Sequence, residues 1–144
     1  MNLAPQFSIV TLGVGDLDRS TAFYASLGWE QKGRLSDGIV WFRTTGTWIG
    51  LYPTADLAAD AGLELPPSLP AYRGITLALN YGSRDEVDAA FNLIAEAGGT
   101  IVKPAERTDW GGYSGYIADP DGVLWEIAHA PGSSIDDQGR LHLP

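Results

Sequence analysis

Glu126 is the side chain whose type and setting best suit chemistry. It follows the segment Asp119-Pro120-Asp121-Gly122 closely, and Tyr116 precedes it. A carboxylate held among aromatic rings without a cation could exchange a proton with a ligand, as a general base or acid. It could equally accept a hydrogen bond from a tyrosine or an amide without any catalytic role, because no second catalytic group stands at a suitable spacing.

Other catalytic arrangements are hard to build from this composition. The chain has two histidines, His129 and His142, and no cysteine. It therefore lacks a convincing Ser-His-Asp arrangement, and it has no thiolate metal site, cysteine nucleophile or disulfide. His129 stands three residues after Glu126, so on a strand the two side chains should face opposite sides. No glycine-rich phosphate loop precedes a helix.

The charge of the chain limits its partners. Nine basic and 18 acidic residues give a formal net charge of −9. Nucleic-acid binding requires a basic face, and an anionic membrane surface attracts basic segments, so we expect neither partner. The opening MNLAPQF lacks the charged and apolar regions of a signal peptide, and the absence of cysteine fits a reducing compartment. The expected location is the cytoplasm.

Hydrophobic periodicity predicts a strand, a helix and three further strands in the first half. Asp16 or Asp18 can cap the helix, and Gly28 ends it. The expected strands are 7–13, 29–34, 39–43 and 47–52, and the expected helix is 16–27.

The second half repeats this plan. Ser83 and Glu86 form a capping box at the start of a helix that Gly98 and Gly99 end. The expected strands are 74–80, 100–103, 115–118 and 124–128, with a turn at Asp119-Pro120-Asp121-Gly122.

The whole chain thus predicts an α+β fold of two tandem β-α-β-β-β modules, about 7–53 and 74–130, within a single domain 1–132. The segment 54–73 between them is either a connection or a lid over a pocket. The tail 133–144 either forms a small hairpin or stays loose.

Two segments carry a resemblance to a known family. They are Val14 to Glu30 (VGDLDRSTAFYASLGWE) and Gly112 to Gly132 (GYSGYIADPDGVLWEIAHAPG). The chain resembles the vicinal oxygen chelate superfamily, also called glyoxalase/bleomycin resistance protein/dioxygenase. The resemblance implies curved sheets that enclose a pocket, and a homodimer.

Metal-dependent members of this superfamily hold a divalent ion with His, Gln or Glu side chains from four strands. The position seven residues before Asp16 is Ile9, and the position before the apolar run of the second half is Gly74. The segment 39–55 contains no His, Asp, Glu, Gln, Asn or Cys. Only Glu126 matches the pattern, and one carboxylate does not hold zinc, iron or manganese. We therefore expect no metal and no other cofactor.

Alternation along the strands predicts which residues face the pocket. Gly13, Gly74, Ala78, Leu124 and Ala128 belong to this set as small or apolar positions. The candidate ligand-binding residues from this alternation are Ile9, Thr11, Thr76, Asn80 and Glu126. Aromatic residues that lie nearby in the sequence, with directions that alternation does not set, complete the candidates: Trp41, Trp48, Trp110, Tyr113 and Tyr116. The Trp110-Gly111-Gly112-Tyr113 segment is either a stacking platform or a tight bend whose aromatics complete the core.

Two functional hypotheses follow. The first is a metal-free protein that binds or sequesters a small hydrophobic, aromatic or cationic molecule, as the bleomycin-resistance branch does. The second is a lyase- or dioxygenase-type enzyme that uses Glu126, with or without a metal held by unrecognised ligands. A third possibility is an interaction module with an empty pocket.

Overall fold

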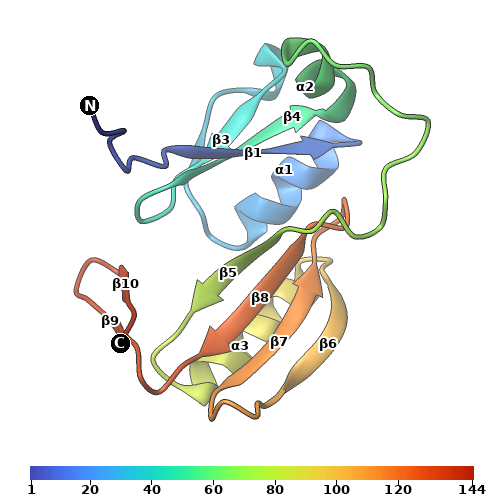
Figure 1. Ribbon diagram of the computed structural model, residues 1–144. Coiled ribbons are helices and arrows are strands. Elements are labelled where there is room, and N and C mark those ends of the chain that lie inside the picture. Colours follow the sequence, from blue (N-terminus) through green and yellow to red (C-terminus); the bar gives the residue numbers. More distant parts are fainter. The chain divides into compact units, whose positions relative to one another are not determined.

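Two four-stranded sheets, each with a helix packed on one face, are the main elements of the chain (Figure 1). The computed structural model describes residues 1–144. The chain divides into two units, residues 1–65 and 66–144. This boundary falls inside the segment 54–73 that the sequence predicts to connect the modules.

Unit 1 is a mixed sheet with strand order β1-β4-β3-β2. Strands β1 and β4 are parallel, and the other neighbours are antiparallel. The elements are β1 (Ile9–Val14), α1 (Leu17–Ser26), β2 (Gln31–Lys32), the 3-10 helix η1 (Leu35–Asp37), β3 (Val40–Phe42), β4 (Trp48–Pro53) and α2 (Thr54–Asp60).

Helix α1 provides the apolar cover for this sheet. Asp16 caps it, because its Oδ1 accepts a hydrogen bond from the Arg19 amide at 3.0 Å. Phe23 and Tyr24 are buried, and Tyr24 also contacts Phe42 of β3. An apolar helix face packed on an apolar sheet face excludes water from both and forms the core of the unit.

Unit 2 repeats the arrangement with strand order β5-β8-β7-β6, and β5 and β8 are parallel. Helix α3 lies behind this sheet in Figure 1. The elements are β5 (Thr76–Asn80), α3 (Arg84–Glu96), β6 (Thr100–Arg107), β7 (Tyr113–Ala118), β8 (Leu124–His129), β9 (Ser134–Ile135) and β10 (Leu141–His142). The predicted fold, an α+β pair of β-α-β-β-β modules, is confirmed.

The predicted capping box at the start of α3 is half formed, because the Glu86 carboxylate bonds to the Ser83 hydroxyl instead of the Ser83 backbone amide. The Ser83 hydroxyl accepts from the Glu86 amide at 3.2 Å, and it also donates to the Glu86 carboxylate at 3.1 Å. The apolar stripe of α3 is buried against the sheet, with Phe91 against Gly115 of β7. A Cβ at Gly115 would lie 2.6 Å from Phe91 Cζ, so only glycine lets helix and strand approach this closely.

Five strand extents differ from the sequence prediction. Strands β1 and β5 each begin two residues later than expected, so Gly74 lies outside β5. The strand expected at 29–34 is reduced to β2, because Gly33 turns the chain with φ +83° and Asp37 accepts from the Arg34 amide to form η1. Strand β6 continues beyond the expected end at 103, and β7 begins at Tyr113 instead of 115. The tail forms the hairpin β9–β10. No helix of the structure combines the length and apolarity required to cross a bilayer.

Candidate functional site

The open face of unit 1 is the side of its sheet that α1 does not cover. Phe42 marks the covered side, because its ring lies 5.9 Å from the ring of Tyr24 on α1. Side chains alternate along each strand, so the neighbouring residues point to the open face. The register brings together four predicted ligand residues there: Ile9, Thr11, Trp41 and Trp48.

The Trp41 indole lies over Gly50, its cross-strand partner. A Cβ at Gly50 would be 3.3 Å from Trp41 Cδ1 and 3.1 Å from Thr11 Oγ1. A Cβ at Gly33 would be 3.2 Å from Trp41 Cζ3. The two glycines therefore leave the space that the indole occupies, and any larger side chain at either position would displace it.

A shallow hollow opens beside this indole. Its volume is about 260 Å³, and it is lined by Ile9, Lys32, Trp41 and Trp48. We call it the unit 1 hollow. Ile9 pairs with Trp48, and Lys32 pairs with Trp41, so the lining residues are two cross-strand pairs. Apolar surface of this kind suits a flat organic molecule.

Charged groups gather at the Lys32 side of the hollow. Lys32 Nζ lies 2.6 Å from Glu30 Oε1, and Arg43 Nη1 lies 3.9 Å from Glu30 Oε2. The hydrogen bond and the positive charge of Lys32 hold the pKa of Glu30 below its usual range, and Arg43 adds to this effect. Two cations share one carboxylate, so this cluster carries a net positive charge.

The open face of unit 2 carries Glu126. In the register, Ala78 of β5, Glu126 of β8, Tyr116 of β7 and Lys103 of β6 are neighbours in one row across the sheet. This row lies opposite α3, because residues of the other parity, such as Gly115, contact the helix. Within its unit the Glu126 carboxylate makes no hydrogen bond or ion pair, so it is available to a ligand.

Tyr116 is the titratable neighbour of Glu126. Burial raises the pKa of the Tyr116 phenol, and the nearby Glu126 carboxylate raises it further. Lys103 acts in the opposite direction. The phenol is therefore held in its neutral form, in which it can donate one hydrogen bond.

Thr76 and Asn80 lie on the same open face, in line with Leu124 and Ala128. Asn80 also lines a second hollow of about 240 Å³ at the end of β5, where Ile135 and Leu141 of the C-terminal hairpin form part of the wall. The C-terminal tail therefore lines the same hollow as Asn80.

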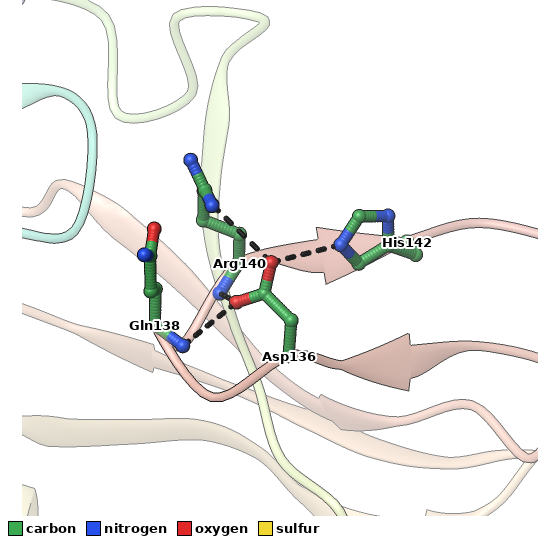
Figure 2. A network of polar contacts seen from close by, with 4 residues as sticks. All are labelled: Asp136, Gln138, Arg140 and His142. Atoms are coloured by element: carbon green, nitrogen blue, oxygen red, sulfur yellow. Dashed lines mark hydrogen bonds and ion pairs between the residues drawn. The ribbon is translucent and has the colours of Figure 1, made fainter.

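Figure 2 shows how the C-terminal hairpin is held together. The Asp136 carboxylate accepts hydrogen bonds from the Gln138 and Arg140 amides, both at 2.9 Å. It also accepts from His142 Nε2 at 3.0 Å and from Arg140 Nε at 3.2 Å. The His142 hydrogen bond, followed by the backbone and side-chain bonds, holds the pKa of Asp136 well below its usual range.

Tyr113 and Trp110 are not part of the Glu126 row. Tyr113 stands three residues before Tyr116 on β7, so it faces α3, where its hydroxyl donates to Asp88 Oδ1 at 2.8 Å. Trp110 is 58% exposed, and its ring folds over Gly112, where a Cβ would be 1.9 Å from Cζ3. The segment therefore forms a tight bend, but Trp110 does not complete the core as that interpretation expects.

A known protein family matches most of this chain. The model of the Glyoxalase/Bleomycin resistance protein/Dioxygenase superfamily matches residues 6–127. The chain belongs to this superfamily. The resemblance carried by the two sequence segments is thereby confirmed.

Solved structures of superfamily members are similar over nearly the whole chain. A glyoxalase-related enzyme from Fulvimarina pelagi shares 31% identity over 97% of this chain and 99% of its own, with a TM-score of 0.85. A glyoxalase/bleomycin resistance protein from Albidiferax ferrireducens T118 shares 26% identity over 87% and 98%, with a TM-score of 0.65. A Nocardioides member, at 23% identity over 90% and 85% and a TM-score of 0.75, is similar in fold. No curated protein matches the sequence significantly.

The residues of this superfamily member do not fit a divalent metal ion. No three His, Cys, Asp or Glu side chains gather in a way that could hold one. On the open face of unit 1 the row contains Ile9, Trp41 and Trp48, which donate no electron pair to a metal. Glu126 is a single carboxylate beside a tyrosine and an alanine.

Sequence reasoning missed Lys32 and Gly50 in this superfamily member. Lys32 was assigned to a strand without a role, although Glu30 and Lys32 stand two apart and so face the same side as each other. Gly50 interrupts an otherwise bulky strand between Trp48 and Tyr52. A glycine in such a strand signals the close approach of another group, which here is the Trp41 indole.

Proposed function

We propose that this superfamily member binds a small aromatic molecule at the unit 1 hollow and needs no metal to hold it. The observation that carries the proposal is that two tryptophans and Ile9 line one hollow of about 260 Å³. An engineered cavity of about 150 Å³ accommodates benzene, so one or two fused rings match this size. Burial of apolar surface on the rings would supply the main driving force.

Binding can be tested with naphthalene derivatives as probes, by calorimetry and by quenching of tryptophan fluorescence. Trp41→Ala and Trp48→Ala should each weaken probe binding by about tenfold, because truncation of a tryptophan at a binding centre typically costs more than 1 kcal/mol. Leu63→Ala removes an exposed apolar side chain of unit 1 that does not line the hollow, and it is the matched control. Unchanged binding in both tryptophan variants would contradict the proposal.

The metal-free part of the proposal has its own test. Elemental analysis of untagged protein should find no stoichiometric metal, and Zn²⁺, Mn²⁺, Ni²⁺ and Fe²⁺ should leave the melting temperature unchanged. A ligand that binds only the folded state must raise this temperature. One metal per chain, with a shift that is lost in Glu126→Ala, would overturn this part.

An enzyme that uses Glu126 is the second candidate. It is favoured by the unpaired carboxylate beside Tyr116, where a ligand could exchange a proton with Glu126. Consumption of a bound compound by the wild type, but not by Glu126→Gln with its binding intact, would support this candidate. Mass spectrometry of the compound after incubation distinguishes the two outcomes.

The proposal includes a homodimer, as the family resemblance implies. Light scattering coupled to size exclusion should then give twice the mass of one chain, which is 15.4 kDa. A mass of one chain at micromolar concentration would contradict it.

A further inference from the structure

We infer that the unit 1 hollow selects aromatic molecules that carry an anionic group, with aromatic carboxylates as the ligand class. The inference rests on the proposed function and adds the chemistry of the ligand to it. It departs from the cationic ligand that the net charge of the whole chain suggests. The inference is based on the hydrogen-bond donors and the charged side chains around the hollow.

The surface of the hollow is mostly apolar, and the polar side-chain groups of its lining residues are donors. The Lys32 ammonium donates, and an indole N–H donates and cannot accept. The indoles of Trp41 and Trp48 make no hydrogen bond within the chain. A ligand that brings acceptors could accept from the indole N–H groups and share Lys32 with Glu30, whereas a ligand that brings another cation or donor could pair with neither.

The charged residues beside the hollow also favour an anionic ligand group. Glu30 is the one acidic side chain paired with Lys32 and Arg43, at 2.6 Å and 3.9 Å. Arg34, the next cation along the chain, is paired with Asp37 at 3.3 Å. One carboxylate between two cations leaves an unbalanced positive charge at the edge of the hollow, and an anionic ligand group would balance it.

The net charge of −9 does not cancel this preference. Charges in water are largely screened beyond a Debye length of about 8 Å at physiological ionic strength. A ligand on the tryptophans would lie next to Lys32, because Lys32 pairs with Trp41 across the sheet. The side chains of Lys32 and Glu30 are both about half exposed, at 52% and 53%, so the expected contribution is moderate.

The test compares naphthoate with the uncharged naphthamide and the cationic naphthylmethylamine at pH 7. Wild-type protein should bind naphthoate about two- to fivefold more tightly than naphthamide, the range expected for an exposed ion pair. Naphthylmethylamine should bind most weakly. The advantage of naphthoate should shrink as salt is raised.

Three variants assign the effect to the cluster. Lys32→Gln should remove the advantage of naphthoate over naphthamide. Glu30→Gln should increase the advantage, because it frees Lys32 from its partner. Arg34→Gln makes the same change in net charge as Lys32→Gln but lies outside the hollow, so it should have no effect. Melting temperatures establish that each variant is folded.

Two results would overturn the inference. Equal affinity for naphthoate and naphthamide, unchanged in Lys32→Gln, would refute the anionic ligand class and leave aromatic binding in place. Tighter binding of naphthylmethylamine would reverse the sign of the preference. Absence of binding by all three probes would instead refute the proposed function itself.

Discussion

Trp41 and Gly50 face each other across β3 and β4, and the indole occupies the space that a side chain at position 50 would fill. The hollow on the open face of unit 1 therefore depends on an absent side chain as much as on the aromatic residues that line it. A substitution at Gly50 would act on the hollow through Trp41, without replacing any residue that lines it.

Gly50→Val should displace the Trp41 indole and weaken the binding of naphthalene probes, with a loss of about 1–3 kcal/mol in the free energy of unfolding from overpacking. Valine is otherwise favourable in a strand, so propensity alone would predict the opposite change in stability. Gly46→Ala is the control, because a Cβ there meets nothing within 4 Å. Wild-type affinity in Gly50→Val would show that the indole position does not matter.

Gly115→Ala should be among the most damaging single changes in unit 2. The added Cβ would lie 2.5 Å from the Lys103 carbonyl oxygen and 2.6 Å from Phe91 Cζ. We expect a loss of about 1–3 kcal/mol in urea unfolding. Gly132→Ala, whose Cβ would make an ordinary contact of 3.6 Å with Pro144, should unfold as the wild type does. Equal stability of both variants would contradict the close approach of α3 and β7.

Glu126→Gln should lower the pKa of Tyr116, because the negative charge that raises it is removed. Lys103→Gln should raise the pKa of Tyr116, because the positive charge that lowers it is removed. Ultraviolet titration of the phenolate measures both, with Tyr116→Phe to identify the signal. Shifts in the same direction would show that Tyr116, Glu126 and Lys103 are not neighbours.

The C-terminal hairpin should lose stability only in strong acid. The pKa of Asp136 is lowered in the folded chain, so its stabilisation is complete above the ordinary aspartate pKa of about 3.9 and is lost as the pH falls through the folded-state value. Amide resonances of Gln138 and Arg140 should report this loss. His142→Gln should move the transition to higher pH, because it removes the largest cause of the shift. A transition that stays in place would contradict the role of His142.

Local signals in the sequence predicted most of the fold. The Ser83 cap starts α3, and the turn before Gly122 has glycine in the left-handed conformation at φ +82°. These features depend on a few adjacent residues, so they can be read without the tertiary structure. The strand expected at 29–34 was too long, because Gln31 and Lys32 are an exposed edge with no apolar alternation to extend it.

The candidate site was harder to predict, because it depends on the directions of side chains. The tryptophans of β3 and β4 were expected near the pocket, but only the register shows that both point to the open face. Tyr113 was also a predicted ligand residue, but it does not point to the open face of its sheet. Once β7 is known to begin at Tyr113, alternation places it away from Tyr116, and its hydroxyl is bonded to Asp88 instead.

In each unit the last long strand pairs with the first, β4 with β1 and β8 with β5. The chain that separates Thr76 from its partner Leu124 includes α3, β6 and β7, so the pairing closes a long loop and is expected to form late and slowly. During synthesis β5 would remain without its neighbour until β8 leaves the ribosome. A chain shortened just before residue 124 would thus lose the order of β5 as well as β8, even though the sequence of β5 is intact.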